Sequence, residues 1–112
     1  MFHANLTADQ TVPPVASSGS GLGMFTLNGN TLSYHITVQN LTSPITAAHF
    51  HLGAAGQNGS VIQPIEFSGS TADGVWNNLT QDQINDLNAG LIYVNVHTSN
   101  FPDGEIRGQV LP

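Results

Sequence analysis

The chain has 112 residues, with one basic side chain, seven acidic ones and a net charge of −6, and this length predicts a single domain spanning residues 1–112. So few cationic side chains argue against nucleic acid as a partner, because phosphate binding needs several of them, and no apolar run is long enough for membrane insertion. Cysteine is absent, which excludes a disulfide framework, a thiolate nucleophile and a cysteine-based zinc site.

Alternation of apolar and polar residues predicts about eight β-strands. In chain order they cover residues 2–7, 22–27, 31–39, 45–51, 61–67, 74–78, 91–98 and 104–111. One short helix is expected at about residues 80–89, because Thr80 and Gln83 form a capping-box pattern and Gly90 can end a helix. Asn28-Gly29-Asn30 is typical of a tight hairpin turn. The pattern predicts an all-β fold, either an antiparallel Greek-key β-sandwich or a flattened barrel, and leaves both alternatives open.

The first candidate site is His49-Phe50-His51, in the fourth predicted strand. Residues two apart on a strand share a face, so both imidazoles point the same way while Phe50 points to the opposite face. Two histidines in this spacing are a familiar metal-binding arrangement, because they reach one ion without a special backbone conformation.

The last two predicted strands carry further polar residues on one face. Tyr93, Asn95 and His97 alternate with apolar residues in one strand, and Glu105 and Arg107 lie on the polar, outward face of the other. If these strands pair through the turn between them, His97 and Glu105 come close together, in a register that the sequence does not determine.

Three imidazoles and one carboxylate would converge if the His49/His51 strand lies beside these two strands. His49, His51, His97 and Glu105 then form a candidate metal site, which suits copper or zinc better than calcium because imidazole is the main ligand. Glu105 is expected either to bind the metal or to orient an imidazole through its free N–H. Residues expected to support the site structurally are Arg107, Tyr93 and Asn95.

Other interpretations of the same residues remain open. Histidines on polar strand faces are commonly solvated, and His3 and His35 are expected to be surface residues. Glu105 and Arg107 can form a local ion pair, worth about 0–1 kcal/mol if it is exposed.

Signals for catalysis are weak. The chain lacks a Gly-x-Ser-x-Gly nucleophile elbow and a phosphate-binding glycine loop with lysine. Most of its acidic residues lie at turn or helix-start positions. The sequence therefore favours a protein without enzymatic activity, although it does not decide the question.

Several segments, in order along the chain, resemble the CHRD domain, a family named after chordin and common in bacterial secreted proteins. They are LTADQTVPPV at 6–15 followed by glycines at 19–23, AAHFHLG at 47–53 with GQNGSV at 56–61, YVNVHT at 93–98 and FPDGEIRGQ at 101–109. The family's asparagine-proline turn appears here with one inserted residue, as Asn100-Phe101-Pro102. The resemblance implies a compact, mostly β domain that is secreted, periplasmic or at the cell surface, with no generally assigned activity. The family's defining residues coincide with His49, His51, His97, Glu105 and Arg107.

Three functions are compatible with this sequence. The first is a non-catalytic extracytoplasmic domain that binds copper or zinc through the histidines. The second is an extracellular module for protein interaction or self-association, in which the same residues form a structural hydrogen-bond network. The third is a redox metalloprotein similar to the copper/zinc superoxide dismutases, which also place a His-x-His on a strand of a β-sandwich; this analogy rests on the fold alone.

Overall fold

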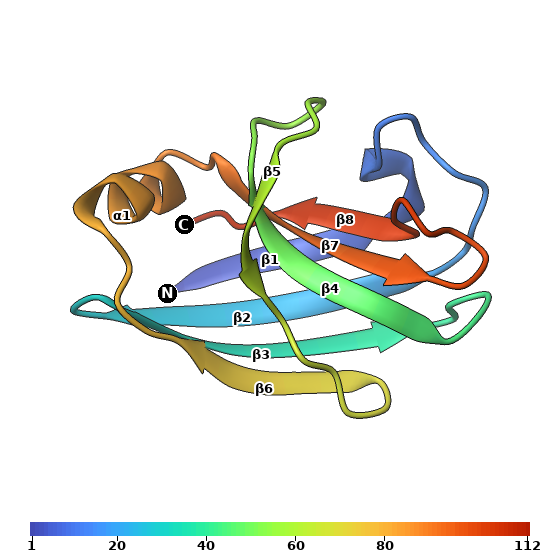
Figure 1. The fold of residues 1–112 in the computed structure, drawn as a ribbon, viewed down its shortest axis with the longest axis horizontal. Helices are drawn as coiled ribbons and strands as arrows, with labels where there is room; N and C mark the ends of the chain where they lie inside the picture. The colour runs from blue at the N-terminus through green and yellow to red at the C-terminus, as the bar shows by residue number, and fades with distance from the viewer.

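The computed structural model describes residues 1–112 and contains eight antiparallel strands in one sheet. The order across the sheet is β5-β4-β7-β8-β1-β2-β3-β6, and the sheet curls into a nearly closed barrel whose two edges are β5 and β6 (Figure 1). The all-β prediction is confirmed, in its barrel form. The strands are β1 (Phe2–Thr7), β2 (Ser20–Asn28), β3 (Thr31–Gln39), β4 (Ile45–Leu52), β5 (Ser60–Pro64), β6 (Thr71–Trp76), β7 (Ile92–Thr98) and β8 (Ile106–Gln109).

The local signals in the sequence correspond to real turns and caps. The single α-helix, α1 (Gln81–Asn88), begins at the predicted capping box: the Gln83 N–H donates to Thr80 Oγ1, and the Thr80 N–H donates to Gln83 Oε1. The β2–β3 hairpin pairs Asn28 with Thr31, so Gly29, at φ +64°, is the first of only two loop residues. Neither α1 nor the short 3-10 turn η1 (Ala8–Gln10) has the length and apolar character of a membrane-spanning helix.

The ends of some strands differ from the prediction. β6 begins at Thr71 rather than at residue 74, and β8 is limited to Ile106–Gln109. The residue before Glu105, Gly104, has φ +123°, and the Glu105 N–H bonds to the Val96 carbonyl although Val96 is in register with Ile106. The β7–β8 hydrogen-bond ladder is therefore interrupted at Glu105. As a result, the Glu105 side chain does not point in the direction that regular alternation along β8 would give it.

The barrel interior is filled by the apolar residue of each alternating pair. Phe50 is fully buried, and its ring centroid lies 6.0 Å from that of Phe25, 5.5 Å from Tyr34 and 5.1 Å from Trp76. These partners belong to β2, β3 and β6, which are not neighbours of β4 in the sheet. The contacts therefore cross the barrel, and His49 and His51, on either side of Phe50 in the chain, lie on its outer surface.

The outer face of β4, β7 and β8 is covered, which argues against the alternative interpretation of a solvated face. Arg107 is 2% exposed and Glu105 is fully buried, so the alternative of an exposed local ion pair between them does not hold. Three connecting segments lie over this face, 11–15, 53–59 and 100–104. They are held by hydrogen bonds such as that from Asn58 Nδ2 to the Val12 carbonyl, 2.9 Å. Strand periodicity does not reveal a loop that folds back over the polar face.

Candidate metal centre

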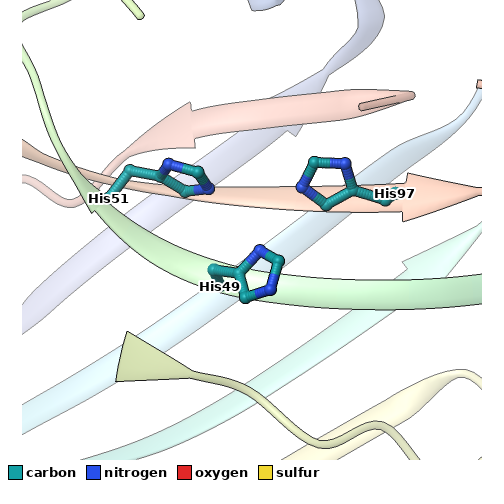
Figure 2. A group of neighbouring side chains, drawn as sticks. All are labelled: His49, His51 and His97. Atoms are coloured by element: carbon teal, nitrogen blue, oxygen red, sulfur yellow. The ribbon is translucent and has the colours of Figure 1, made fainter. Parts of the chain in front are cut away.

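Three histidines from two neighbouring strands converge on the covered face. His49 and His51 lie on β4 and His97 lies on β7, whose register pairs His97 with Ala47 and Asn95 with His49. One ring nitrogen of each histidine lies within 4.8 Å of the other two. Ring centroids are 5.2 Å apart for His49 and His97, 5.5 Å for His49 and His51, and 6.3 Å for His51 and His97. Figure 2 shows one nitrogen of each ring pointing into the space between the three rings.

Backbone carbonyls orient two of these imidazoles. His51 Nδ1 lies 3.0 Å from the Gly59 carbonyl oxygen, and His97 Nδ1 lies 2.8 Å from that of Pro102. Because a carbonyl oxygen only accepts, each Nδ1 must carry a proton, and in the neutral form of each ring this leaves Nε2 with a free lone pair. These two Nε2 atoms and Nδ1 of His49 are buried and have no hydrogen-bond partner.

Gly59 is required by this arrangement for a steric reason. A Cβ at residue 59 would lie 1.5 Å from the Leu52 carbonyl oxygen, so only glycine allows the chain to approach β4 so closely. The same residue donates its N–H to the Tyr93 hydroxyl at 2.9 Å. Gly59 thus fixes both an imidazole and the tyrosine beside it.

The electrostatic environment favours the neutral form of His49 and His51. Burial, reinforced by the charge of nearby His97, lowers the pKa of His49 below its ordinary 6.5. Burial also lowers the pKa of His51; its hydrogen bond to Gly59 opposes the shift, while charge on the other two histidines and on Arg107 adds to it. A neutral imidazole is the form that binds a metal ion.

Glu105 does not join the histidines. Its Oε1 accepts from the hydroxyls of Thr42 and Thr98, both at 2.8 Å, and its Oε2 accepts from the Ser17 hydroxyl at 2.7 Å and the Thr42 N–H at 2.9 Å. Burial alone would raise the pKa of Glu105, but these four donors outweigh it and hold the pKa below 4.5. The carboxylate is therefore a buried anion within its own network, and the expectation that it faces the histidines is not met.

Arg107 also has different partners from those expected. Its Nη2 donates to the Ala54 carbonyl at 2.9 Å and to Gln109 Oε1 at 3.1 Å, and no ion pair joins it to Glu105. The guanidinium carbon lies 3.5 Å from the centroid of the Tyr93 ring, which in turn stacks on His51 at 4.8 Å and 7°. Arg107 Nη1 is buried without a partner.

The remaining predicted site residues are distributed as follows. Asn95 is buried beside the histidines and donates to the Ile106 carbonyl at 3.3 Å. His3 and His35 lie on exposed faces, as expected, and His35 pairs with Asp73.

Sequence reasoning missed the residues that bind Glu105. Ser17 and Thr42 lie in loops 88 and 63 residues away from Glu105 in the chain, where no local pattern marks them. Thr98 carried a usable signal, because it occupies an inward-facing position in a strand whose other inward residues are apolar. A polar group at such a position needs a buried partner.

A pocket of about 550 Å³ lies between the covering segments and the sheet. His51, His97, Tyr93, Asn95 and Arg107 line it. A tripod of three nitrogens leaves at least one coordination position of a tetrahedral ion open. Because two of the three imidazoles line the pocket, such a position would be accessible from it.

The comparisons with known proteins identify the family. No curated protein and no solved structure matches the chain. The family model described as the CHRD domain matches residues 2–110, almost the whole chain, which includes every strand and all three clustered histidines. The chain therefore belongs to the CHRD domain family.

Proposed function

We propose that this chain is a non-catalytic extracytoplasmic domain that binds one copper or zinc ion through His49, His51 and His97. The observation that carries this proposal is the convergence of three buried ring nitrogens without hydrogen-bond partners. Each buried polar atom left without a hydrogen-bond partner costs about 1–3 kcal/mol, so three in one place call for a ligand that satisfies all of them. A single metal ion does so.

The donor set restricts the choice of metal. Neutral imidazole suits copper and zinc, whereas calcium and magnesium require oxygen ligands. Two of the imidazoles donate their second N–H to backbone carbonyls, which is the usual way of fixing the orientation of a metal-binding histidine. Among divalent ions, copper is expected to bind more tightly than zinc at such a site.

The alternative of a structural hydrogen-bond network accounts for part of the set. It explains Glu105, whose four hydrogen bonds tie the loops at Ser17 and Thr42 to β7. It does not explain the histidines, because the nitrogens that face each other have no donors between them. The occurrence of CHRD domains in extracellular proteins supports a secreted, periplasmic or cell-surface location.

Titration of untagged, chelator-treated protein with Zn²⁺ and Cu²⁺ tests the proposal, with calorimetry for affinity and elemental analysis for stoichiometry. We expect one ion per chain, and a loss of at least tenfold in affinity in His51→Ala and in His97→Ala. The reference protein and every variant carry His3→Ala, so that the exposed His3 near the N-terminus does not compete for copper. His35→Ala is the matched control, because His35 is exposed and lies outside the cluster.

The proposal is refuted if neither metal binds, or if His51→Ala and His97→Ala retain the stoichiometry and affinity of the His35→Ala control. Circular dichroism on each variant establishes that a loss of binding does not come from unfolding.

A further inference from the structure

Arg107 is the only basic side chain of the chain and it is buried without an acidic partner. Its hydrogen bonds go to a backbone carbonyl and to the side-chain oxygen of Gln109, both uncharged, and Nη1 has no partner at all. A buried charge is costly unless an opposite charge compensates for it. Glu105, the nearest acid in sequence, is fully engaged by Ser17, Thr42 and Thr98.

The guanidinium and the histidines belong to one face of the sheet. In the register of β4, β7 and β8, His49, Asn95 and Arg107 form one row across the three strands. Tyr93, on the central strand, contacts His51 on one neighbouring strand and Arg107 on the other. Strands are about 4.8 Å apart, so the two ends of this row are separated by roughly two strand spacings. The same pocket of about 550 Å³ is lined by His51, His97 and Arg107.

The pocket has the size and the charge of a site for a small anion. Its volume lies within the usual range of small-molecule sites. Asp103, which is exposed, is the only acidic residue in its lining. A divalent ion on three neutral imidazoles, together with Arg107, would place three positive charges around it. These charges form two centres, the ion on the histidines and the guanidinium, at opposite ends of a row that spans roughly two strand spacings.

We infer that this pocket binds a small dicarboxylate. One carboxylate takes the open position of the metal ion, and the other is held by Arg107. This inference rests on the proposed function, because it needs an ion on the three histidines. Two acidic groups on one short molecule match two positive centres that a single carboxylate cannot reach together, and the planar guanidinium is well suited to bind a carboxylate.

Cobalt-loaded protein provides the test, because Co²⁺ replaces zinc in nitrogen ligand sets and its visible absorption reports a change of ligand. The probe is succinate, and acetate is the single-carboxylate comparator. We expect succinate to change the cobalt spectrum with saturation at one equivalent, and to bind at least tenfold more tightly than acetate. Arg107→Gln should weaken succinate binding by about tenfold or more, and leave acetate binding nearly unchanged.

A second variant protects the test against misfolding of Arg107→Gln. Asp103→Asn removes the only acid of the pocket lining from an exposed position, so it should fold normally and bind succinate several times more tightly. If the protein takes up none of Cu²⁺, Zn²⁺ and Co²⁺, the proposed function itself is refuted, and this inference with it. If it takes up Zn²⁺ but not Co²⁺, calorimetry on the zinc-loaded protein measures the same succinate and acetate affinities. If Co²⁺ binds but succinate has no advantage over acetate, or neither variant changes succinate binding, the metal proposal stands and the dicarboxylate site is refuted.

Discussion

Replacement of Glu105 separates a structural role of this carboxylate from a metal-binding role. Glu105 is fully buried and accepts four hydrogen bonds, two at each oxygen. Glu105→Gln keeps the shape of the side chain and removes its charge. Glu105→Ala removes the acceptors altogether and leaves the hydroxyls and N–H groups around it without a partner.

The geometry of the network allows the two costs to be estimated. In Glu105→Gln the amide oxygen can take the place of Oε2, which accepts from the Thr42 backbone N–H, a group that can only donate. The NH₂ group then takes the place of Oε1. The donors at Oε1 are the hydroxyls of Thr42 and Thr98, which can rotate to accept instead. Because charged hydrogen bonds are roughly twice as strong as neutral ones, we expect a loss of about 1–2 kcal/mol. Glu105→Ala should cost about 3–5 kcal/mol.

Urea unfolding at pH 7 with an unchanged m-value measures both losses. The pH dependence gives an independent check. Because the folded-state pKa of Glu105 lies below 4.5, its contribution is fully present above pH 4.5 and is lost as the pH falls through the folded-state pKa. Glu105→Gln should lack this part of the acid destabilisation and should bind metal with unchanged stoichiometry. A Glu105→Gln protein as stable as the wild type, or one that has lost its metal, would contradict this account.

Three further perturbations test the core and the centre. Phe50→Ala should destabilise the fold by about 3–5 kcal/mol in urea unfolding, because Phe50 fills the barrel interior; a loss below 1 kcal/mol would mean that the barrel is packed differently. Gly59→Ala should lower metal affinity more than global stability, because its Cβ would collide with the Leu52 carbonyl and displace the loop that orients His51; unchanged affinity by calorimetry would disprove this. Metal-free protein should lose stability as the pH falls from 6.5 towards the folded-state pKa of His49 and His51, because the unfolded chain binds protons that these buried imidazoles resist. His51→Gln should reduce that loss, and equal pH profiles would exclude the mechanism.

The features that the sequence predicts correctly are those set by neighbours along the chain. Period-two alternation locates the strands and puts Phe50 inside with His49 and His51 outside, because alternation is a property of the extended backbone itself. The capping box at Thr80 and the turn at Gly29 depend equally on a few adjacent residues. The convergence of His97 with the other two histidines is conditional on the two strands lying side by side, and the β4–β7 pairing meets that condition.

The features that the sequence does not predict depend on segments far apart in the chain. Nothing local indicates that Glu105 turns from the histidines to Ser17 and Thr42, because the cause is an interrupted ladder together with donors from two distant loops. Similarly, Arg107 belongs to a polar alternation that is typical of a solvated face. Its burial depends on the segment 53–59 folding over the sheet and accepting its hydrogen bond at Ala54.

The covering segments and the candidate centre form one physical unit. The carbonyl of Gly59 comes from the segment after β4 and that of Pro102 from the segment after β7, and each fixes the tautomer of one histidine. If either segment opened, its imidazole would lose the hydrogen bond that orients it, and His51 would also lose the burial that lowers its pKa. If an ion binds these nitrogens as proposed, its affinity should depend on the closed state of both segments. An ion that binds only this state would stabilise it in proportion to the logarithm of the ion concentration over Kd. The same covering buries Arg107, whose guanidinium donates to the Ala54 carbonyl of the segment 53–59. In the proposed function, closure would therefore prepare the metal position and the cationic end of the pocket together.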